Sequence, residues 1–118
     1  MNDNELTVRD FIAAWSRLDA AELASYFADD GCYWNMPAQP VHGRQNIERL
    51  IRSFVAIWTE THWDIRTLLA SGDRVVAERL DRTKATQGDV DLPCLGIFVM
   101  RDGMIVQWRD YFDLSTYG

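Results

Sequence analysis

Five polar residues of this 118-residue chain occupy positions where strand-like patterns are otherwise apolar, and their side chains suit acid–base chemistry. Arg79 and Asp81 are two positions apart, so on a strand both side chains point to the same face. Asp110 has large apolar residues two positions away on either side, and Tyr33 and Asn35 also share a face. A curved sheet that turned these faces inward would gather all five on its concave side.

Two carboxylates with one arginine between them leave a net charge of −1, which is costly to bury unless one carboxyl keeps its proton. An Asp–Arg–Asp group that shares one proton would hold a base and an acid side by side. The alternative is that Arg79 and Asp81 form a solvated pair on an outer face. On strand parity alone, the solvated pair is the commoner arrangement.

Amphipathic segments in the first half of the chain predict helices. Apolar residues recur at three- and four-residue steps over Leu6–Leu18. Asp19, with Glu22 three residues later, predicts the start of a short helix that extends to Phe27. A third helix is predicted for 43–58, after a short strand at 32–35 that follows a turn at 29–31.

The second half alternates with a period of two, which predicts strands at 61–69, 74–83, 90–101 and 104–114. Turn residues at 71–73 and Asp102-Gly103 predict hairpins. In the first of these strands Trp63, Ile65, Thr67 and Leu69 would share one side, and in the last strand Val106 would share the side of Asp110. The order predicts one α+β domain over residues 1–118, with a curved antiparallel sheet wrapped around the helices.

Composition excludes several classes of partner. A net charge of −6 and a pI near 4.7 argue against nucleic acid. No apolar run is long enough to span a membrane and the acidic start lacks a signal peptide's basic region, so we expect a cytoplasmic protein. Cys32 and Cys94 are expected to be buried thiols, and His42 and His62 are not spaced as metal ligands.

Three local patterns resemble the limonene-1,2-epoxide hydrolases, a branch of the superfamily that shares the cone-shaped fold of nuclear transport factor two and the SnoaL-like cyclases. Their order and separations also match, over about Leu6 to Leu114. The patterns are Tyr33-Trp34-Asn35-Met36-Pro37, Glu78-Arg79-Leu80-Asp81 and Trp108-Arg109-Asp110-Tyr111-Phe112-Asp113. The resemblance implies a cone built from a mixed sheet around three to four N-terminal helices. It also favours the buried reading of Arg79 and Asp81.

The resemblance implies one-step addition of water to an epoxide, giving a vicinal diol. Asp110 would deprotonate the water, which Tyr33 and Asn35 would hold and aim. Asp81 would donate a proton to the epoxide oxygen, and Arg79 would bridge the two carboxyl groups. This chemistry needs no metal or organic cofactor.

The substrate expected from this resemblance is an apolar cyclic or aryl epoxide. The residues expected to line its pocket are Leu92, Cys94, Phe98, Phe112, Phe54, Trp58 and Trp15. Trp34, Trp63 and Trp108 are expected to be core or interface aromatics. Relatives of this kind pair through the sheet, and the aromatic side chains of Tyr111 and Tyr117 suit an interface, so we expect a homodimer.

Two other functions remain open on the sequence. A ketosteroid-isomerase-like or SnoaL-like enzyme would abstract a carbon-bound proton with one carboxylate, and it would need an oxyanion donor facing a lone base. A binding module without catalysis would use the polar group only as a buried network.

Overall fold

The computed structural model describes residues 2–113 and 115. Leu114 and Tyr117, which the sequence analysis placed in the last strand and at an interface, lie outside the described residues. In chain order the elements are α1 (Asp3–Ala14), the 3₁₀ turn η1 (Trp15–Arg17), α2 (Ala20–Ala24), β1 (Phe27–Asn35), β2 (Val41–His42), α3 (Arg44–Val55), β3 (Trp58–Ser71), β4 (Arg74–Ala85), β5 (Gly88–Arg101) and β6 (Met104–Phe112).

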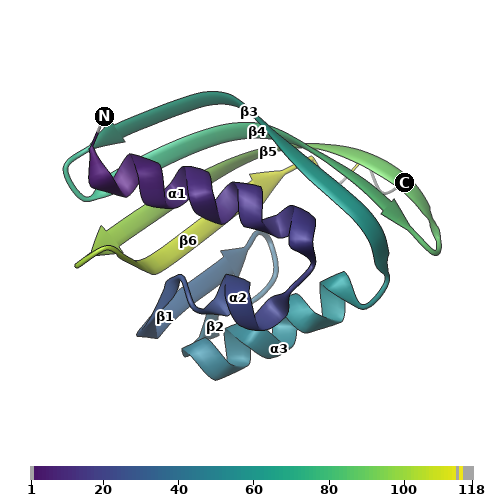
Figure 1. Cartoon of the computed structure of the whole chain (residues 1–118), viewed down its shortest axis with the longest axis horizontal. Helices are drawn as coiled ribbons and strands as arrows, with labels where there is room; N and C mark the ends of the chain where they lie inside the picture. Colours follow the sequence, from purple (N-terminus) through teal and green to yellow (C-terminus); the bar gives the residue numbers. More distant parts are fainter. Residues whose placement is uncertain (1, 114, 116–118) are drawn as a thin grey trace.

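The strands form one mixed sheet in the order β2-β1-β6-β5-β4-β3. Strand β1 runs parallel to β6, and every other neighbouring pair is antiparallel. Figure 1 shows the long strands β3 to β6 curving around α1, with α2 and α3 beside β1 and β2. The predicted α+β class, with a curved sheet around N-terminal helices, is confirmed.

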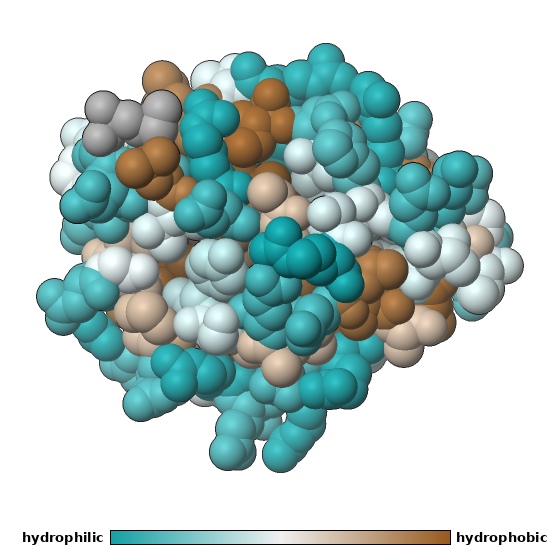
Figure 2. Space-filling view, viewed as in Figure 1, coloured by the Kyte–Doolittle hydropathy of each residue, from teal (hydrophilic) through white to brown (hydrophobic). Residues whose placement is uncertain are grey.

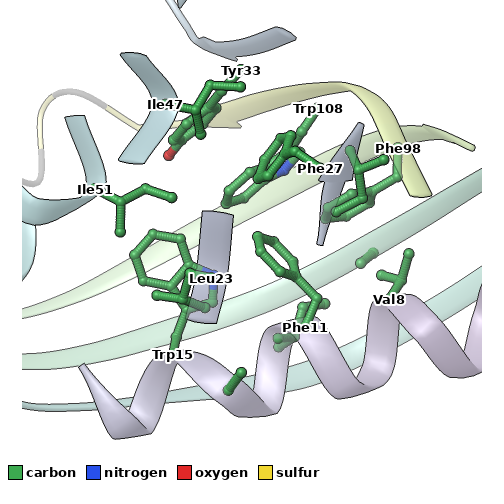
Figure 3. Packing of buried hydrophobic residues seen from close by; sticks show 14 of the residues in the cluster. Val8, Phe11, Trp15, Leu23, Phe27, Tyr33, Ile47, Ile51, Phe98 and Trp108 are labelled. Atoms are coloured by element: carbon green, nitrogen blue, oxygen red, sulfur yellow. The ribbon is translucent and has the colours of Figure 1, made fainter. Parts of the chain in front are cut away.

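Helix α1 closes the concave side because its apolar stripe meets the inward face of the sheet. The side chain of Asn2 accepts a hydrogen bond from the backbone nitrogen of Glu5 and so caps the helix. Phe11 is fully buried and makes an edge-to-face contact with Trp108 of β6, with ring centroids 5.2 Å apart. Figure 3 shows Phe11 reaching from α1 toward Trp108 and Phe98, with Trp15 of η1 pointing to the same side. The core thus lies between the helices and the sheet.

Two irregularities reverse the strand parity that alternation predicts. Between Ile65 and Thr67 the β3–β4 register shifts, and beyond it Leu68 packs toward the core while Leu69 is 64% exposed. The prediction that Thr67 and Leu69 share one side with Trp63 and Ile65 is therefore wrong. A second shift, between Val99 and Met100, buries Ile105 in place of the predicted Val106. A bulge adds one residue to a strand, so every later side chain changes face.

Three predicted boundaries also differ. The short helix ends at Ala24, and Phe27 already begins β1. Gly31 lies within β1 rather than in a turn, since a register shift between Phe27 and Cys32 accommodates this stretch. Helix α3 ends at Val55, and Trp58 is the first residue of β3, where it lies opposite Ala85. In each case pairing with a neighbouring strand overrides the local helical or turn pattern.

The face shown in Figure 2 is largely hydrophilic, with its hydrophobic surface in separate patches. Among the described residues, no helix is long and apolar enough to cross a membrane.

Candidate active site

One buried arginine joins two buried aspartates on the concave side of the sheet. Arg79 on β4 donates from Nε and Nη2 to the two carboxylate oxygens of Asp81, at 2.9 Å each. It also donates from Nη1 and Nη2 to the two oxygens of Asp110 on β6, at 2.8 and 2.7 Å. The Arg79 side chain has no exposed surface, and the aspartate side chains are 7% and 6% exposed. The arrangement is a bidentate contact on each side of one guanidinium.

The three groups lie on strands that are not all neighbours, because β5 runs between β4 and β6. Gly96 on β5 lies directly opposite Ala77 on one side and Asp110 on the other. A Cβ atom at Gly96 would come within 3.0 Å of Arg79 Nη1 and 3.1 Å of Asp110 Oδ1. The missing side chain therefore leaves the space in which the arginine reaches across β5.

Burial and the neighbouring charges change the pKa values of Asp81 and Arg79. Burial raises the pKa of Asp81 above its ordinary value, and the hydrogen bonds from Arg79 act against that rise. Burial alone would lower the pKa of Arg79, but Asp110 and Asp81 raise it well above its ordinary value. Arg79 therefore stays charged, and Asp81 is the carboxyl whose neutral form the site favours.

Two indole rings pack against the faces of the Arg79 guanidinium. The Arg79 Cζ atom lies 4.5 Å from the ring centroid of Trp63 and 5.5 Å from that of Trp108. Trp63 in turn stacks on Trp15, with centroids 4.3 Å apart and an interplanar angle of 17°. The orientation of the arginine is thus fixed by carboxylates at its edges and by indoles at its faces.

Tyr33 and Asn35 come from β1, which pairs with β6 in parallel. Their register partners on β6 are Trp108 and Asp110 respectively, and the Tyr33 ring stacks on Trp108 at 4.3 Å. Burial, followed by the adjacent Asp110 carboxylate, raises the pKa of Tyr33 well above its ordinary value. The phenol therefore stays protonated and can donate a hydrogen bond.

A cavity of about 440 Å³ opens above these polar groups. Tyr33, Asn35, Asp81 and Asp110 line it, whereas Arg79 lies beneath its floor. Of the residues predicted to line the pocket, five do so, namely Trp15, Phe54, Trp58, Leu92 and Phe112. The volume is that of a site for a small organic molecule.

Two residues predicted to line the pocket do not lie on this cavity. Phe98 is fully buried in the core, where it stacks on Trp108 at 5.3 Å and meets Phe11 edge to face. Cys94 lies behind Asp81, with its Sγ 3.4 Å from Asp81 Oδ2. Both side chains point inward as the strand parity predicted, but Phe98 packs against Phe11 of α1 and the Cys94 thiol contacts Asp81.

Trp63 was expected only as a core or interface aromatic, but it also lines the cavity and contacts Arg79. Its position opposite Asp81 in the β3–β4 pairing is the signal that could have placed it there. The rim of the cavity comes from the β4–β5 hairpin, including Thr83, Gln87 and Asp89. Among residues 2–113 and 115, no three His, Cys, Asp or Glu side chains are grouped so that they could hold a metal ion.

Solved structures of the same fold include several kinds of protein. An LEH-like epoxide hydrolase from M. tuberculosis is 26% identical, with a TM-score of 0.85, over 97% of this chain and 85% of that one. A protein of ketosteroid isomerase-like fold from Catenulispora acidiphila, in complex with trimethylamine, is 24% identical, with a TM-score of 0.85, over 93% and 87%. A putative SnoaL-like polyketide cyclase from Shewanella putrefaciens is 16% identical, with a TM-score of 0.89, over 99% and 94%.

The matched fold is common to proteins of different activities, so these likenesses establish architecture rather than reaction. The family model of the SnoaL-like domain matches residues 8–108, which include most of α1, all of α2 and α3, the five strands β1 to β5 and the first half of β6. That range covers most of the chain and contains Tyr33, Asn35, Arg79 and Asp81. This protein therefore belongs to the SnoaL-like domain family.

Proposed function

We propose that this protein is a cofactor-independent epoxide hydrolase of the limonene-1,2-epoxide hydrolase type, with its site in a single domain over residues 1–118. Asp110 takes a proton from a water molecule as the water oxygen bonds to one ring carbon. The carbon–oxygen bond of the ring breaks, and Asp81 donates its proton to the departing oxygen. The product is a vicinal diol, and a proton then returns from Asp110 to Asp81.

The observation that carries this proposal is the pair of buried carboxyl groups on one arginine at the floor of an aromatic cavity. Addition of water to an epoxide needs a base and an acid within reach of the same small molecule. Asp110 and Asp81 both line the cavity, and Arg79 separates them. With Asp81 neutral, the Asp–Arg–Asp group carries no net charge, which fits its burial.

Tyr33 and Asn35 support the same assignment of roles. Both line the cavity beside Asp110, and both side chains can hydrogen-bond a water molecule. A water molecule held by these residues and Asp110 would have one lone pair left to attack the ring carbon. This division makes Asp110 the base and leaves Asp81 as the acid.

The walls of the cavity indicate the substrate class. Trp15, Phe54, Trp58, Leu92 and Phe112 are apolar, which suits a cyclic or aryl epoxide. Phe54 and Trp58 stack at 6.0 Å with an interplanar angle of 15°. This nearly parallel aromatic pair in the lining suits a ring-shaped substrate.

Diol formation from limonene 1,2-epoxide, cyclohexene oxide and styrene oxide, in buffer with a chelator, tests this function. We expect diol from the wild type and a loss of about 10²-fold or more in both Asp110→Asn and Asp81→Asn. Asp64→Asn is the matched control, because Asp64 contacts His62 and Arg82 away from the cavity. Asp64→Asn should keep wild-type activity.

Diol formation at the wild-type rate in both Asp110→Asn and Asp81→Asn would contradict the proposal. If the wild type forms no diol but exchanges deuterium from solvent into a ketone, the protein has an isomerase-like activity and the epoxide hydrolase proposal is wrong. The position of Arg79 disfavours an isomerase, because Arg79 donates hydrogen bonds to both carboxyl groups and neither is left as a lone base.

A further inference from the structure

The thiol of Cys94 makes two contacts that compete for one proton. Its Sγ lies 3.4 Å from Asp81 Oδ2 and 3.3 Å from the backbone oxygen of Leu92. A thiol has a single hydrogen, so it can donate to only one of these two acceptors at a time. Cys94 is 5% exposed, so water has little access to either contact.

The other partner of Asp81 cannot adapt in this way. Arg79 donates to both oxygens of Asp81 whether that carboxyl is neutral or ionised, because a guanidinium has no acceptor. Of the side chains that hydrogen-bond Asp81 in the described part of the chain, only the thiol can turn its donor toward or away from the carboxyl. The neutral carboxyl needs fewer donors than the carboxylate.

We propose that Cys94 is a positioning residue for the proton donor: its S–H turns to Asp81 Oδ2 when Asp81 is ionised and to the Leu92 oxygen when Asp81 is neutral. This rests on the proposed function, in which Asp81 loses its proton in every turnover. When the S–H reorients toward Asp81, it stabilises the carboxylate just after proton transfer. When the S–H returns to the Leu92 oxygen, that stabilisation is lost and Asp81 is protonated again more readily.

The surroundings keep the thiol in the form that this role needs. Burial, and then the neighbouring Asp81 carboxylate, raise the pKa of the Cys94 thiol well above its ordinary value. The sulfur therefore remains S–H throughout the range in which Asp81 titrates. Cys94 pairs directly with Arg79 in the β4–β5 ladder, so the strand fixes the sulfur beside the carboxyl.

The infrared S–H stretching band tests the switch in the folded protein without any turnover. The chain has two cysteines, so Cys32→Ala leaves Cys94 as the sole source of the band. We expect the band to change frequency with pH as Asp81 titrates, because the acceptor of the S–H changes. In Asp81→Asn, with Cys32→Ala, the band should stay constant. A band that ignores pH, or that moves equally in Asp81→Asn, would overturn the proposal.

Variants of Cys94 give a second, kinetic test. Cys94→Ser offers a stronger donor of similar size, and Cys94→Ala offers none. We expect the alkaline limb of the pH–rate profile to move down in Cys94→Ser and up in Cys94→Ala. At a fixed pH on that limb, each rate should differ by about two- to five-fold from the wild-type rate. Cys32→Ala, a buried thiol away from the site, is the control and should leave the limb in place.

A purely structural role would move both Cys94 variants in the same direction or not at all, and that result would overturn the proposal. The carboxyl ¹³C signal of Asp81, identified with Asp81→Asn, follows the same titration in resting protein. The midpoint of this titration should move down in Cys94→Ser and up in Cys94→Ala. If it does so in a protein that opens no epoxide, the result supports the thiol switch and rejects the proposed reaction.

Discussion

Gly96 and Asp110 face each other across the β5–β6 pair, and a Cβ atom at Gly96 would lie only 3.1 Å from Asp110 Oδ1. The same atom would lie 2.8 Å from Trp108 Nε1 and 3.0 Å from Arg79 Nη1. None of these three side chains can retreat easily, since each is almost completely buried. The bare backbone of Gly96 is therefore what lets an arginine on β4 reach a carboxylate on β6.

Gly96→Ala should consequently separate Arg79 from Asp110 and lower kcat/KM by about 10²-fold, the scale of a displacement of about 1 Å in a catalytic group. Gly31→Ala is the matched control. Its added methyl would come within 3.0 Å of the Ala28 oxygen and 3.2 Å of the Ile105 oxygen, and it would touch none of the charged groups. Both variants should lose about 1–3 kcal/mol of stability. Equal losses of activity in the two would contradict the role of Gly96.

The value of kcat/KM should fall as pH rises through the range in which Asp81 loses its proton. Asp81 must be protonated to act as the acid, and burial raises its pKa, so activity persists above the ordinary range of an aspartic acid and falls as pH rises further. Steady-state rates across the pH range measure this fall. Activity that keeps rising into alkali would be inconsistent with Asp81 as proton donor.

Arg79→Met should make stability depend more steeply on pH. Without the guanidinium, an ionised carboxylate is buried without a counter-charge, which costs about 3–5 kcal/mol. Burial favours the neutral acid, so the folded-state pKa of Asp81 lies above its unfolded value. Stability from such a group is present at low pH and is lost as pH rises through the folded-state pKa. The gap to wild type in urea unfolding should therefore widen from acid to neutral pH, and a constant gap would argue against this charge balance.

The outer face of the sheet is expected to join two copies of the chain. Leu69, Leu95 and Tyr111 are exposed, at 64%, 39% and 40%. Arg66 and Glu78 border the same shallow hollow as Leu95 and Tyr111, so charges of both signs are present for a self-complementary contact. Leu95→Asp should shift sedimentation equilibrium toward monomer. Leu6→Asp, on the exposed face of α1, is the control, and a wild type that sediments as a monomer would rule out the dimer.

Strand parity correctly placed Arg79 and Asp81 on one face, whereas their burial was expected only from the family resemblance, because parity alone favours a solvated pair. Arg79 and Asp81 lie on a stretch of β4 that pairs with β5 without interruption, so alternation identifies their face correctly. The same logic failed beyond Ile65, where the bulge turns Leu69 outward. Bulges depend on pairing between distant segments, and alternation within one strand carries no sign of them.

The cavity lining was only partly predictable for a related reason. Parity gives the face of a side chain but not its depth, so Phe98 was expected in the pocket although α1 covers it. Trp63 belongs to the buried core, as expected, but it also lies between Trp15 and the Arg79 guanidinium at the cavity, which was not expected. Both placements follow from how the helices pack on the sheet, a relationship of segments far apart in the chain.

The most direct measurement of the mechanism is a single turnover of epoxide with excess enzyme in H₂¹⁸O. If Asp110 activates a water molecule, the oxygen added in the first turnover comes from solvent, and the diol carries the label at once. If a carboxylate attacked the ring itself, the first diol would take its oxygen from unlabelled protein. Diol that lacks ¹⁸O in the first turnover would contradict the role given to Asp110.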